Sequence, residues 1–309
     1  MQLNSVKTRN IWFGFSGLLV AASIILMIFS AIKIGSPIRL GLDFTGGTKL
    51  EYRFLNSSSL GADHIKSLSG VQTQDILNIL TEVGLENSIA TITKEENPLI
   101  IIRTKAISDD PALDMLNAKL SEKYGAYEIS SIDTVSPIIG PELFKSALIA
   151  LFFTVLGIII YISSRFKRDY AICAIAALFH DVIIVMGLFA FLGLFQGIEV
   201  NSLFITALLT TFGFSVHDTI VVFDRIRENQ KMQSSKFSFE DLANHSVNQV
   251  STRSLNTSIT TLSVLGILFF FGGASTQLFV GALFIGLAIG TYSSLFLASP
   301  LLVWLRARG

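Results

Sequence analysis

Residues 11–32 read IWFGFSGLLVAASIILMIFSAI, an unbroken run without a charged side chain. A helix rises about 1.5 Å per residue, so about 20 apolar residues suffice to cross the hydrocarbon core of a bilayer. Lys7 and Arg9 precede the run. We expect a retained membrane anchor rather than a signal peptide, because the run exceeds the usual short apolar region and no small-residue cleavage site follows it cleanly.

The composition of the whole chain also indicates a membrane protein. Apolar residues make up 51% of the sequence, charged residues only 15%, and the mean hydropathy is +0.61. The formal net charge is zero and neither terminus is strongly acidic or basic, so we predict no nucleic-acid partner. Cys173 is the only cysteine, which excludes an intrachain disulfide framework and a thiolate metal cluster. We predict neither a metal nor a cofactor.

Five further apolar stretches are long enough to cross a membrane, which gives six predicted spans. An even number of spans places both ends of the chain on one side of the membrane. The five stretches are Leu143–Ile162, Tyr170–Phe195, Val200–Phe223, Leu255–Phe271 and Leu278–Leu302.

The distribution of lysine and arginine predicts that both termini are cytoplasmic. Short cytoplasmic loops are enriched in these residues, and the loops at 196–199 and 272–277 contain none of them. The expected domains are therefore residues 1–35 with span one, residues 36–141 outside, and residues 142–309 with spans two to six. The basic residues on the cytoplasmic side are Lys7, Arg9, Arg165, Lys167, Arg168, Arg225, Arg227, Lys231, Lys236, Arg306 and Arg308.

The outer segment has the pattern of a small folded α+β domain rather than of a linker. Four strand-like runs and two amphipathic helices follow in the order β-α-β-β-α-β, which favours a ferredoxin-like fold. Thr73 and Ser108 are candidate helix caps, and Glu96-Asn97-Pro98 predicts a turn between two strands. The expected strands are Lys49–Leu55, Ala90–Thr93, Leu99–Thr104 and Tyr127–Val135, and the expected helices are Asp75–Val83 and Ser108–Lys123.

Three charged residues lie within the predicted spans or at their ends. Asp181 lies in the third span, Asp218 in the cytoplasmic half of the fourth, and Arg253 at the cytoplasmic entrance of the fifth. A charged side chain at membrane depth is costly and normally faces a bundle interior or a wet cavity. We predict functional roles for all three, with a structural hydrogen-bonding role as an equal alternative for Asp181. The neighbouring His180 fits a structural role better.

Asp218 and Arg253 each belong to a polar stripe on one helix face. The two spans are consecutive and antiparallel, so the acid and the arginine can meet near the same cytoplasmic depth. Burial and a nearby arginine shift the pKa of an aspartate in opposite directions, so movement of the arginine can switch proton binding. The alternative is a static buried ion pair. The stripes comprise Thr211 and Ser215 before Asp218, and Asn256, Thr257 and Thr260 after Arg253.

Residues 41–48, GLDFTGGT, form a glycine-rich stretch between span one and the first predicted strand. A phosphate-binding loop would follow a strand and lead into a helix, whereas this stretch leads into a strand. We predict instead a tight turn where the chain leaves the membrane and enters the outer domain. Its glycines are Gly41, Gly46 and Gly47, and its acid, Asp43, can accept hydrogen bonds from backbone amides.

Four stretches of the sequence resemble signature regions of the SecD/SecF family of bacterial protein-export proteins. The most specific is FGFSVHDTIVVFDRIREN at 212–229, and GLDFTGGT is weaker when taken alone. LFHDVII at 178–184 and STRSLNTSITT at 251–261 match the other characteristic regions. The six spans and single outer domain also fit, so the resemblance covers nearly the whole chain.

The resemblance implies an accessory factor of the Sec translocon, in the resistance-nodulation-division superfamily, that uses proton flow to help pull polypeptides outward. In that family the residues matching Asp218 and Arg253 are implicated in proton conduction. His217 stands where the family often has asparagine, and Thr252 where it often has serine. These departures leave the role of Asp218 intact and its protonation cycle open.

The resemblance also implies partners and a location. Superfamily transporters use two six-helix halves and this chain supplies one, so SecD is the expected complement. The other implied partners are the SecYEG translocon, YajC as a further candidate, the translocating polypeptide and protons. The chain is expected to be no enzyme and to lie in the plasma membrane or, alternatively, the thylakoid membrane.

Two other functions are compatible with the sequence. One is a half-transporter that exports small lipophilic molecules, and the other is a membrane scaffold with static buried ion pairs. An outer domain of this size favours protein export, because an exporter of drugs or lipids normally needs a larger outer region. Span six also has a ridge of small residues, and the sequence leaves open whether it meets SecD or packs within the chain. The ridge comprises Ala282, Gly286, Gly290 and Ser294.

Overall fold

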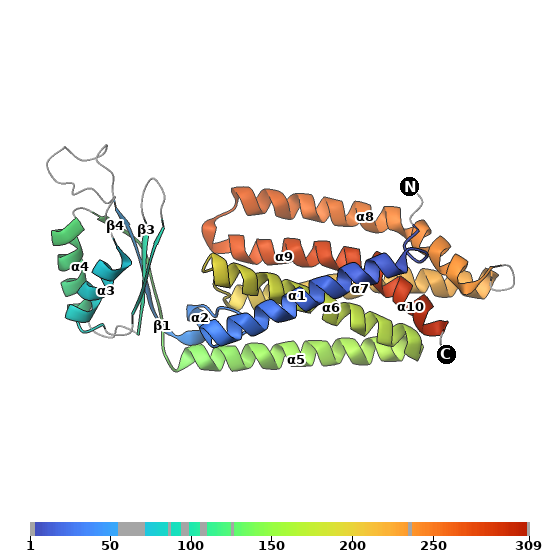
Figure 1. The fold of residues 1–309 in the computed structure, drawn as a ribbon, viewed down its shortest axis with the longest axis horizontal. Helices are drawn as coiled ribbons and strands as arrows, with labels where there is room; N and C mark the ends of the chain where they lie inside the picture. The colour runs from blue at the N-terminus through green and yellow to red at the C-terminus, as the bar shows by residue number, and fades with distance from the viewer. Residues whose placement is uncertain are drawn as a thin grey trace. The chain divides into compact units, whose positions relative to one another are not determined.

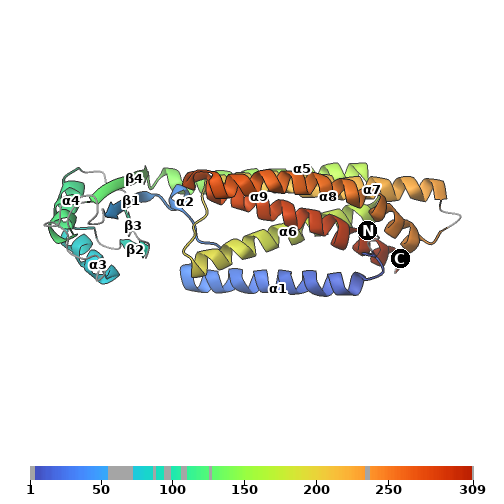
Figure 2. The ribbon, with the colours of Figure 1, turned by 90° about the horizontal axis from the view of Figure 1, so that it is seen from above.

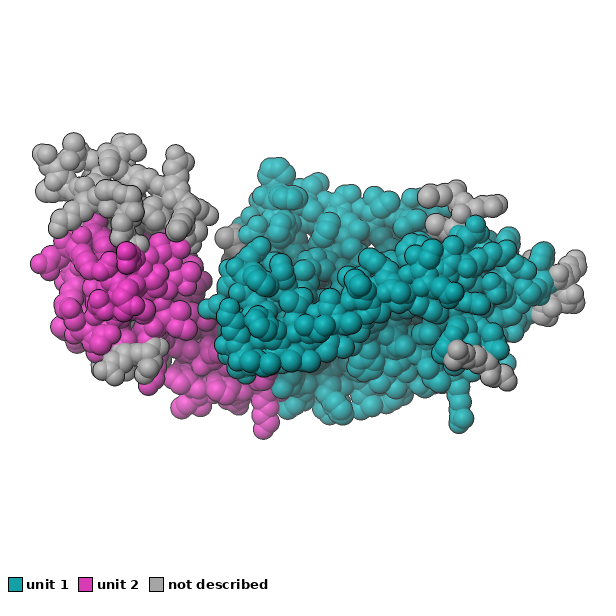
Figure 3. Space-filling view, in the orientation of Figure 1, with its two compact units in different colours: residues 1–40, 147–309 teal, residues 41–146 magenta. Residues whose placement is uncertain are grey.

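The computed structural model describes residues 4–54, 72–85, 88–93, 99–105, 110–124, 127–233 and 237–307. The chain forms two compact units (Figure 3). Met1–Leu40 and Ala147–Gly309 make up the first, and Gly41–Ser146 make up the second.

Six helices in the described part of the chain are long and apolar enough to cross a membrane, which confirms the predicted number of spans. The first five are α1 (Arg9–Ile34), α5 (Ile139–Arg165), α6 (Arg168–Phe195), α7 (Ser202–Gln233) and α8 (Phe239–Phe271). The sixth runs through three elements, which are α9 (Ala274–Ser293), the π-helical turn Ser294–Ala298 and α10 (Ser299–Arg306).

The helices of the first unit lie side by side, and both ends of the chain lie at the same end of this bundle (Figure 1). Helices α6, α7 and α9 are the most buried, whereas no residue of the apolar window of α5 is buried. Large aromatic side chains fill the centre because they bury the most apolar surface per residue. The largest of them are Tyr170, Phe204, Phe212 and Phe223.

Helices α7 and α8 extend well beyond the spans predicted from hydropathy. The fourth span was expected to end at Phe223 and the fifth to begin at Leu255, but α7 continues to Gln233 and α8 begins at Phe239. A hydropathy criterion finds only the membrane segment, whereas a helix can continue into water with polar side chains. The two extensions are joined by hydrogen bonds of 2.8 Å from Asn229 Nδ2 to Ser246 Oγ and to Gln249 Oε1.

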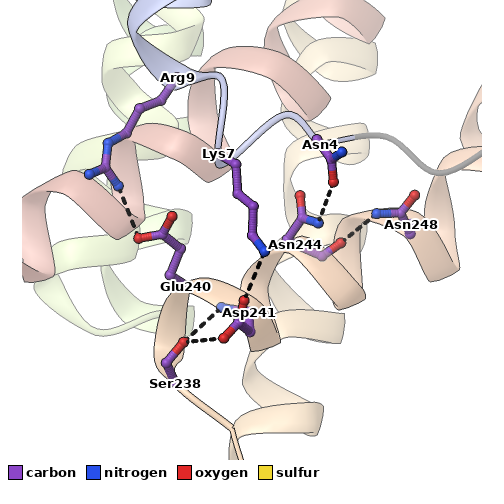
Figure 4. Close-up of polar contacts among 8 residues, drawn as sticks. All are labelled: Asn4, Lys7, Arg9, Ser238, Glu240, Asp241, Asn244 and Asn248. Atoms are coloured by element: carbon purple, nitrogen blue, oxygen red, sulfur yellow. Dashed lines mark hydrogen bonds and ion pairs between the residues drawn. The ribbon is translucent and has the colours of Figure 1, made fainter.

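The start of α1 is attached to the start of α8 by ion pairs (Figure 4). Lys7 Nζ lies 3.3 Å from Asp241 Oδ1, and Arg9 Nη1 lies 3.4 Å from Glu240 Oε2. Ser238 Oγ caps α8 by accepting a hydrogen bond of 3.1 Å from the Asp241 backbone amide. The ion pairs are partly exposed, so each contributes at most about 1 kcal/mol.

The second unit is a four-stranded antiparallel sheet with two helices on one face (Figure 2). Its strands lie in the order β2-β3-β1-β4. Leu50, Tyr52, Ile100 and Ile102 of the central strands pack against apolar residues of both helices. The elements in chain order are β1 (Gly47–Phe54), α3 (Thr73–Glu82), β2 (Ile89–Thr93), β3 (Leu99–Thr104), α4 (Asp110–Tyr124) and β4 (Tyr127–Val135).

Two local predictions in this unit differ from the structure. Residues 42–45 form a single helical turn, α2 (Leu42–Thr45), where only a glycine turn was expected. Thr73 was expected to cap α3, but it is the first residue of that helix. Gln72 occupies the N-cap position, and its side chain forms no capping hydrogen bond. Several predicted features lie outside the described residues, namely Leu55, the turn Glu96–Pro98, Ser108, Lys236 and Arg308.

Candidate functional site

Asp181 lies at the junction of α6, α7 and α9 and is 1% exposed. Its Oδ2 accepts hydrogen bonds from Ser215 Oγ of α7 at 2.5 Å and from Ser293 Oγ of α9 at 2.7 Å. Its Oδ1 lies 2.8 Å from Nδ1 of His180. Both carboxylate oxygens therefore have polar partners, as a buried acid requires.

A ring contact and a hydrogen bond connect His180 to α1. The His180 ring lies 6.3 Å from the Tyr292 ring, and the Tyr292 hydroxyl is 3.0 Å from Ser16 Oγ. The Nε2 atom of His180 is buried and forms no hydrogen bond with the described residues. The direct partners of the carboxylate thus come from α6, α7 and α9, and Ser16 of α1 reaches this group only through Tyr292.

The sixth span changes its helical geometry at this site. The π-helical turn Ser294–Ala298 begins directly after Ser293, which donates to Asp181. Within the turn, Ser294 Oγ donates to the Thr291 carbonyl at 3.0 Å. A π-helical turn is a rare irregularity that is frequently found at functional sites. Its position beside the buried acid makes this part of the span one candidate site.

Asp218 lies at the interface of α7 with α8 and α9 and is only partly buried. Ser254 Oγ of α8 donates to its Oδ2 at 3.4 Å, and Thr291 of α9 lies near its side chain. Ser258 Oγ lies 2.7 Å from Thr291 Oγ1. Hydroxyl groups from two neighbouring helices therefore line the surroundings of this second acid.

The structure does not bring Arg253 to Asp218. Arg253 is exposed, and the described residues contain no ion pair between the two. Successive residues of a helix are rotated by about 100°, so Ser254, which faces Asp218, and Arg253 point in different directions. Asn256, Thr257 and Thr260 are exposed as well, and the two threonine hydroxyls bond to carbonyls of their own helix.

The stripe before Asp218 packs against the small-residue ridge of α9. A Cβ added at Gly290 would lie 3.1 Å from Ser215 Cβ, and one added at Gly286 would overlap the Thr211 side chain. The ridge therefore packs within the chain, where it allows α7 and α9 to approach closely. The adjacent His217 of α7 is exposed.

Sequence reasoning missed the residues that face the two acids from other helices. Ser251, Ser254 and Ser258 are buried and lie on one face of α8, one position away from the stripe that was predicted. Their helical spacing was a usable signal, because buried serines in a span normally face another helix. Ser293 had no comparable signal, since its contact with Asp181 depends on tertiary packing.

The glycine motif positions the start of β1. Gly46 and Gly47 have φ angles of +68° and +118°, which favour glycine. A Cβ at Gly46 would lie 2.8 Å from Pro137 Cα, and a Cβ at Gly47 would lie 2.5 Å from the Thr104 carbonyl oxygen. The structure places Gly41 as the N-cap of α2 and Asp43 in the first turn of that helix.

The described residues contain no group of three or more histidine, cysteine, aspartate or glutamate side chains able to hold a metal ion.

Family models match most of the chain. The model for "Protein export membrane protein SecD/SecF, C-terminal" matches residues 115–308, and the model for the "SecD/SecF GG Motif" matches residues 34–54. The second match contains the glycine motif, and the first contains Asp181, Asp218 and Arg253.

Individual relatives agree with these matches. The protein translocase subunit SecF of Synechocystis is 41% identical over 99% of this chain and 95% of its own length. The subunit SecDF of Bacillus subtilis is 35% identical over 96% of this chain, which spans 37% of that longer protein. The crystal structure of SecDF from Thermus thermophilus, "a translocon-associated membrane protein", superposes with a TM-score of 0.80 at 29% identity, covering 100% of this chain and 39% of that one. This chain therefore belongs to the SecD/SecF family of protein-export membrane proteins.

Proposed function

We propose that the chain is the SecF-type half of a SecD–SecF complex that uses the proton gradient to promote translocation of polypeptides by the Sec translocon. The observation that supports this most is a pair of acids inside the helix bundle. Asp181 and Asp218 both bond to serine hydroxyls on neighbouring helices.

Serine hydroxyls suit an acid that changes its protonation state. A hydroxyl can donate to a carboxylate, and after the acid is protonated the same hydroxyl can rotate and accept a hydrogen bond. An ion pair with a fixed cation would instead hold the acid in its charged form. Proton exchange at Asp218 therefore changes contacts between α7 and α8 without leaving a buried charge unpaired. Asp218 is the primary proton site because it is partly exposed, and Asp181 is the deeper acid.

The exposed polar face of α8 favours a partner protein that contributes transmembrane helices of its own. Arg253, Asn256, Thr257 and Thr260 are exposed on a helix long enough to span a membrane. Polar side chains at membrane depth normally face protein or water rather than lipid. We propose that SecD covers this face and that Arg253 acts in the interface between the two halves. The longer SecDF relatives, which this chain matches over a little more than a third of their length, agree with such a complement.

The second unit is proposed to be an extracytoplasmic ferredoxin-like domain that contacts emerging polypeptides. Its strand order β2-β3-β1-β4 and its β-α-β-β-α-β element order support that fold. On its last strand Ile129 and Ile132 are 38% and 45% exposed, which leaves apolar surface for an unfolded chain. We also propose that both termini lie in the cytoplasm, that the chain lies in the plasma or thylakoid membrane, and that SecYEG and YajC are further partners.

Translocation into membrane vesicles tests this function. A reporter polypeptide is followed with and without an imposed proton gradient, in vesicles with matched amounts of the SecD complex. Asp218→Asn and Arg253→Met should both assemble with SecD and abolish the stimulation by the gradient. The control is Asp224→Asn, which removes a partly exposed carboxylate of the same helix that pairs with Arg165. In the alternative outcome, Asp218→Asn reduces only the amount of complex, and each remaining complex keeps wild-type gradient-dependent translocation. That result would support the scaffold function instead.

A further inference from the structure

A hollow of about 610 Å³ opens where α5 ends and α6 begins. It is lined by basic side chains of the α5–α6 connection and of α7, over two aromatic rings. The α5–α6 connection lies at the end of the bundle that also contains both chain termini (Figure 1). The lining residues that matter here are Arg165, Lys167, Arg227, Lys231, Phe166 and Tyr170.

The hollow has an excess of positive charge. Four of its lining residues are basic and none is acidic. Arg165 pairs with Asp224 outside the lining, at 3.2 Å. Lys167 and Lys231 are exposed and form no ion pair within the described part of the chain. Two lysine ammonium groups are therefore available to an anion.

The walls of the hollow are held in place by aromatic packing. Phe166 and Tyr170 stack with ring centroids 6.0 Å apart, and both rings meet Phe223 edge-on. The Tyr170 hydroxyl donates to Gln230 Oε1 at 3.3 Å, and Arg306 donates to the same oxygen at 3.1 Å. The aromatic part of the lining is thus fixed by ring packing and hydrogen bonds.

The neighbouring surface of α5 is apolar and exposed. Leu156, Ile160 and Tyr161 are 38%, 60% and 52% exposed in the last turns before Arg165. An apolar helix face beside a basic hollow matches a molecule with acyl chains and an anionic headgroup. Basic pockets between membrane helices at the cytoplasmic side are known to bind such headgroups.

We propose that this hollow binds the phosphate of an anionic phospholipid headgroup. Lys167 and Lys231 contact the phosphate, Arg165 and Arg227 add positive charge, and the acyl chains lie along α5. Basic residues at the ends of spans also fix topology, but topology alone requires only their presence and not a shared hollow. The proposal does not depend on proton transport.

Lipid titration of the purified full-length chain, followed by native mass spectrometry, tests the proposal. Phosphatidylglycerol should bind at least about tenfold more tightly than phosphatidylcholine. Removing each lysine should weaken phosphatidylglycerol binding about fivefold, so Lys167→Gln with Lys231→Gln should weaken it about 25-fold. Should the double variant not fold, each single variant supplies the same test, because both side chains are exposed.

The matched control is Arg168→Gln, which removes an exposed charge at the first residue of α6 that does not line the hollow. It should change the affinity by no more than about twofold. An equal loss in Arg168→Gln would show diffuse surface attraction and overturn the site. A second arm adds inorganic phosphate alone. Displacement of the lipid by millimolar phosphate would identify a soluble-anion site and contradict the lipid assignment.

Discussion

Ser293 Oγ, on the last residue of α9, donates a hydrogen bond of 2.7 Å to Oδ2 of Asp181 on α6. The donor sits directly before the π-helical turn and the acceptor is fully buried, so the contact couples an irregular helix to an acid. The hydrogen bond joins α6 to the end of α9 inside the bundle.

Ser293→Ala should destabilise the bundle by about 1–3 kcal/mol, because a buried carboxylate loses one of its donors. The thermal unfolding temperature of the purified protein in detergent measures the effect. Ser263→Ala is the control, since Ser263 is exposed and bonds only to the Ile259 carbonyl of its own helix. That control should change stability by less than about 0.5 kcal/mol. Equal unfolding temperatures for the two variants would show that the Ser293 contact has no energetic weight.

Gly286→Ala should separate α7 from α9, because the new methyl group overlaps the Thr211 side chain. Overpacking of this kind costs about 1–3 kcal/mol. Thr211→Ala in the same chain should restore part of the loss by removing the hydroxyl and methyl groups in the way. Gly213→Ala is the control, since no atom lies within 4 Å of a Cβ at that position. Wild-type unfolding of Gly286→Ala would contradict the close approach of the two helices.

The stability of the second unit should fall above pH 10. Tyr52 is buried and donates to Asn117 Oδ1 at 2.9 Å, and burial raises its pKa above the usual range. The unfolded chain has a tyrosine pKa of about 10, so above that pH the unfolded state loses a proton that the folded state keeps. The stabilising contribution is therefore complete below pH 10 and is lost as the pH rises.

Urea unfolding of the soluble fragment 41–146, followed by circular dichroism, measures this pH dependence. The fragment should give a mixed α/β spectrum, because all residues of its apolar core lie within the fragment. Tyr52→Phe should lower stability at pH 7 by about 1 kcal/mol and should make the decline between pH 10 and 12 shallower. A decline of unchanged slope in Tyr52→Phe would assign the effect to other groups.

Cysteine labelling in intact cells tests the predicted orientation. The native Cys173 is buried and should react slowly, which keeps the background low. Ser130→Cys in the second unit should react with a membrane-impermeant maleimide added outside. Met232→Cys, at a side chain that is 69% exposed, should react only after the membrane is permeabilised. Labelling of both positions from the same side would overturn the six-span topology.

The sequence was sufficient to predict the number of spans and the order of elements in the second unit. Long apolar runs are unambiguous because only helices satisfy their backbone groups in lipid. Strand alternation and helical periodicity in 47–135 likewise reflect which side chains face one core. The helices α7 and α8 are longer than the predicted spans, because a helix can extend past its apolar segment into polar sequence.

The partners of the buried acids could be predicted only in part. Asp181 and Asp218 were identifiable because charges are rare at membrane depth. The meeting of Asp218 with Arg253 was not found, since the rotation of α8 about its own axis depends on contacts with α7 and α9. The predicted neighbour of Asp218 on α8 was Arg253, whereas the structure has the next residue, Ser254, in that position. Periodicity gives a face of a helix but not its partner.

The proposal that Asp218 exchanges protons is tested most directly by a measurement of proton flux. The measurement uses liposomes that contain the purified complex of this chain with SecD. An imposed pH gradient should collapse faster with the wild-type complex than with empty liposomes. Asp218→Asn should reduce this flux to the level of empty liposomes, whereas Asp224→Asn should leave it unchanged. A wild-type rate of collapse in the Asp218→Asn complex, at equal amounts of incorporated protein, would contradict the account.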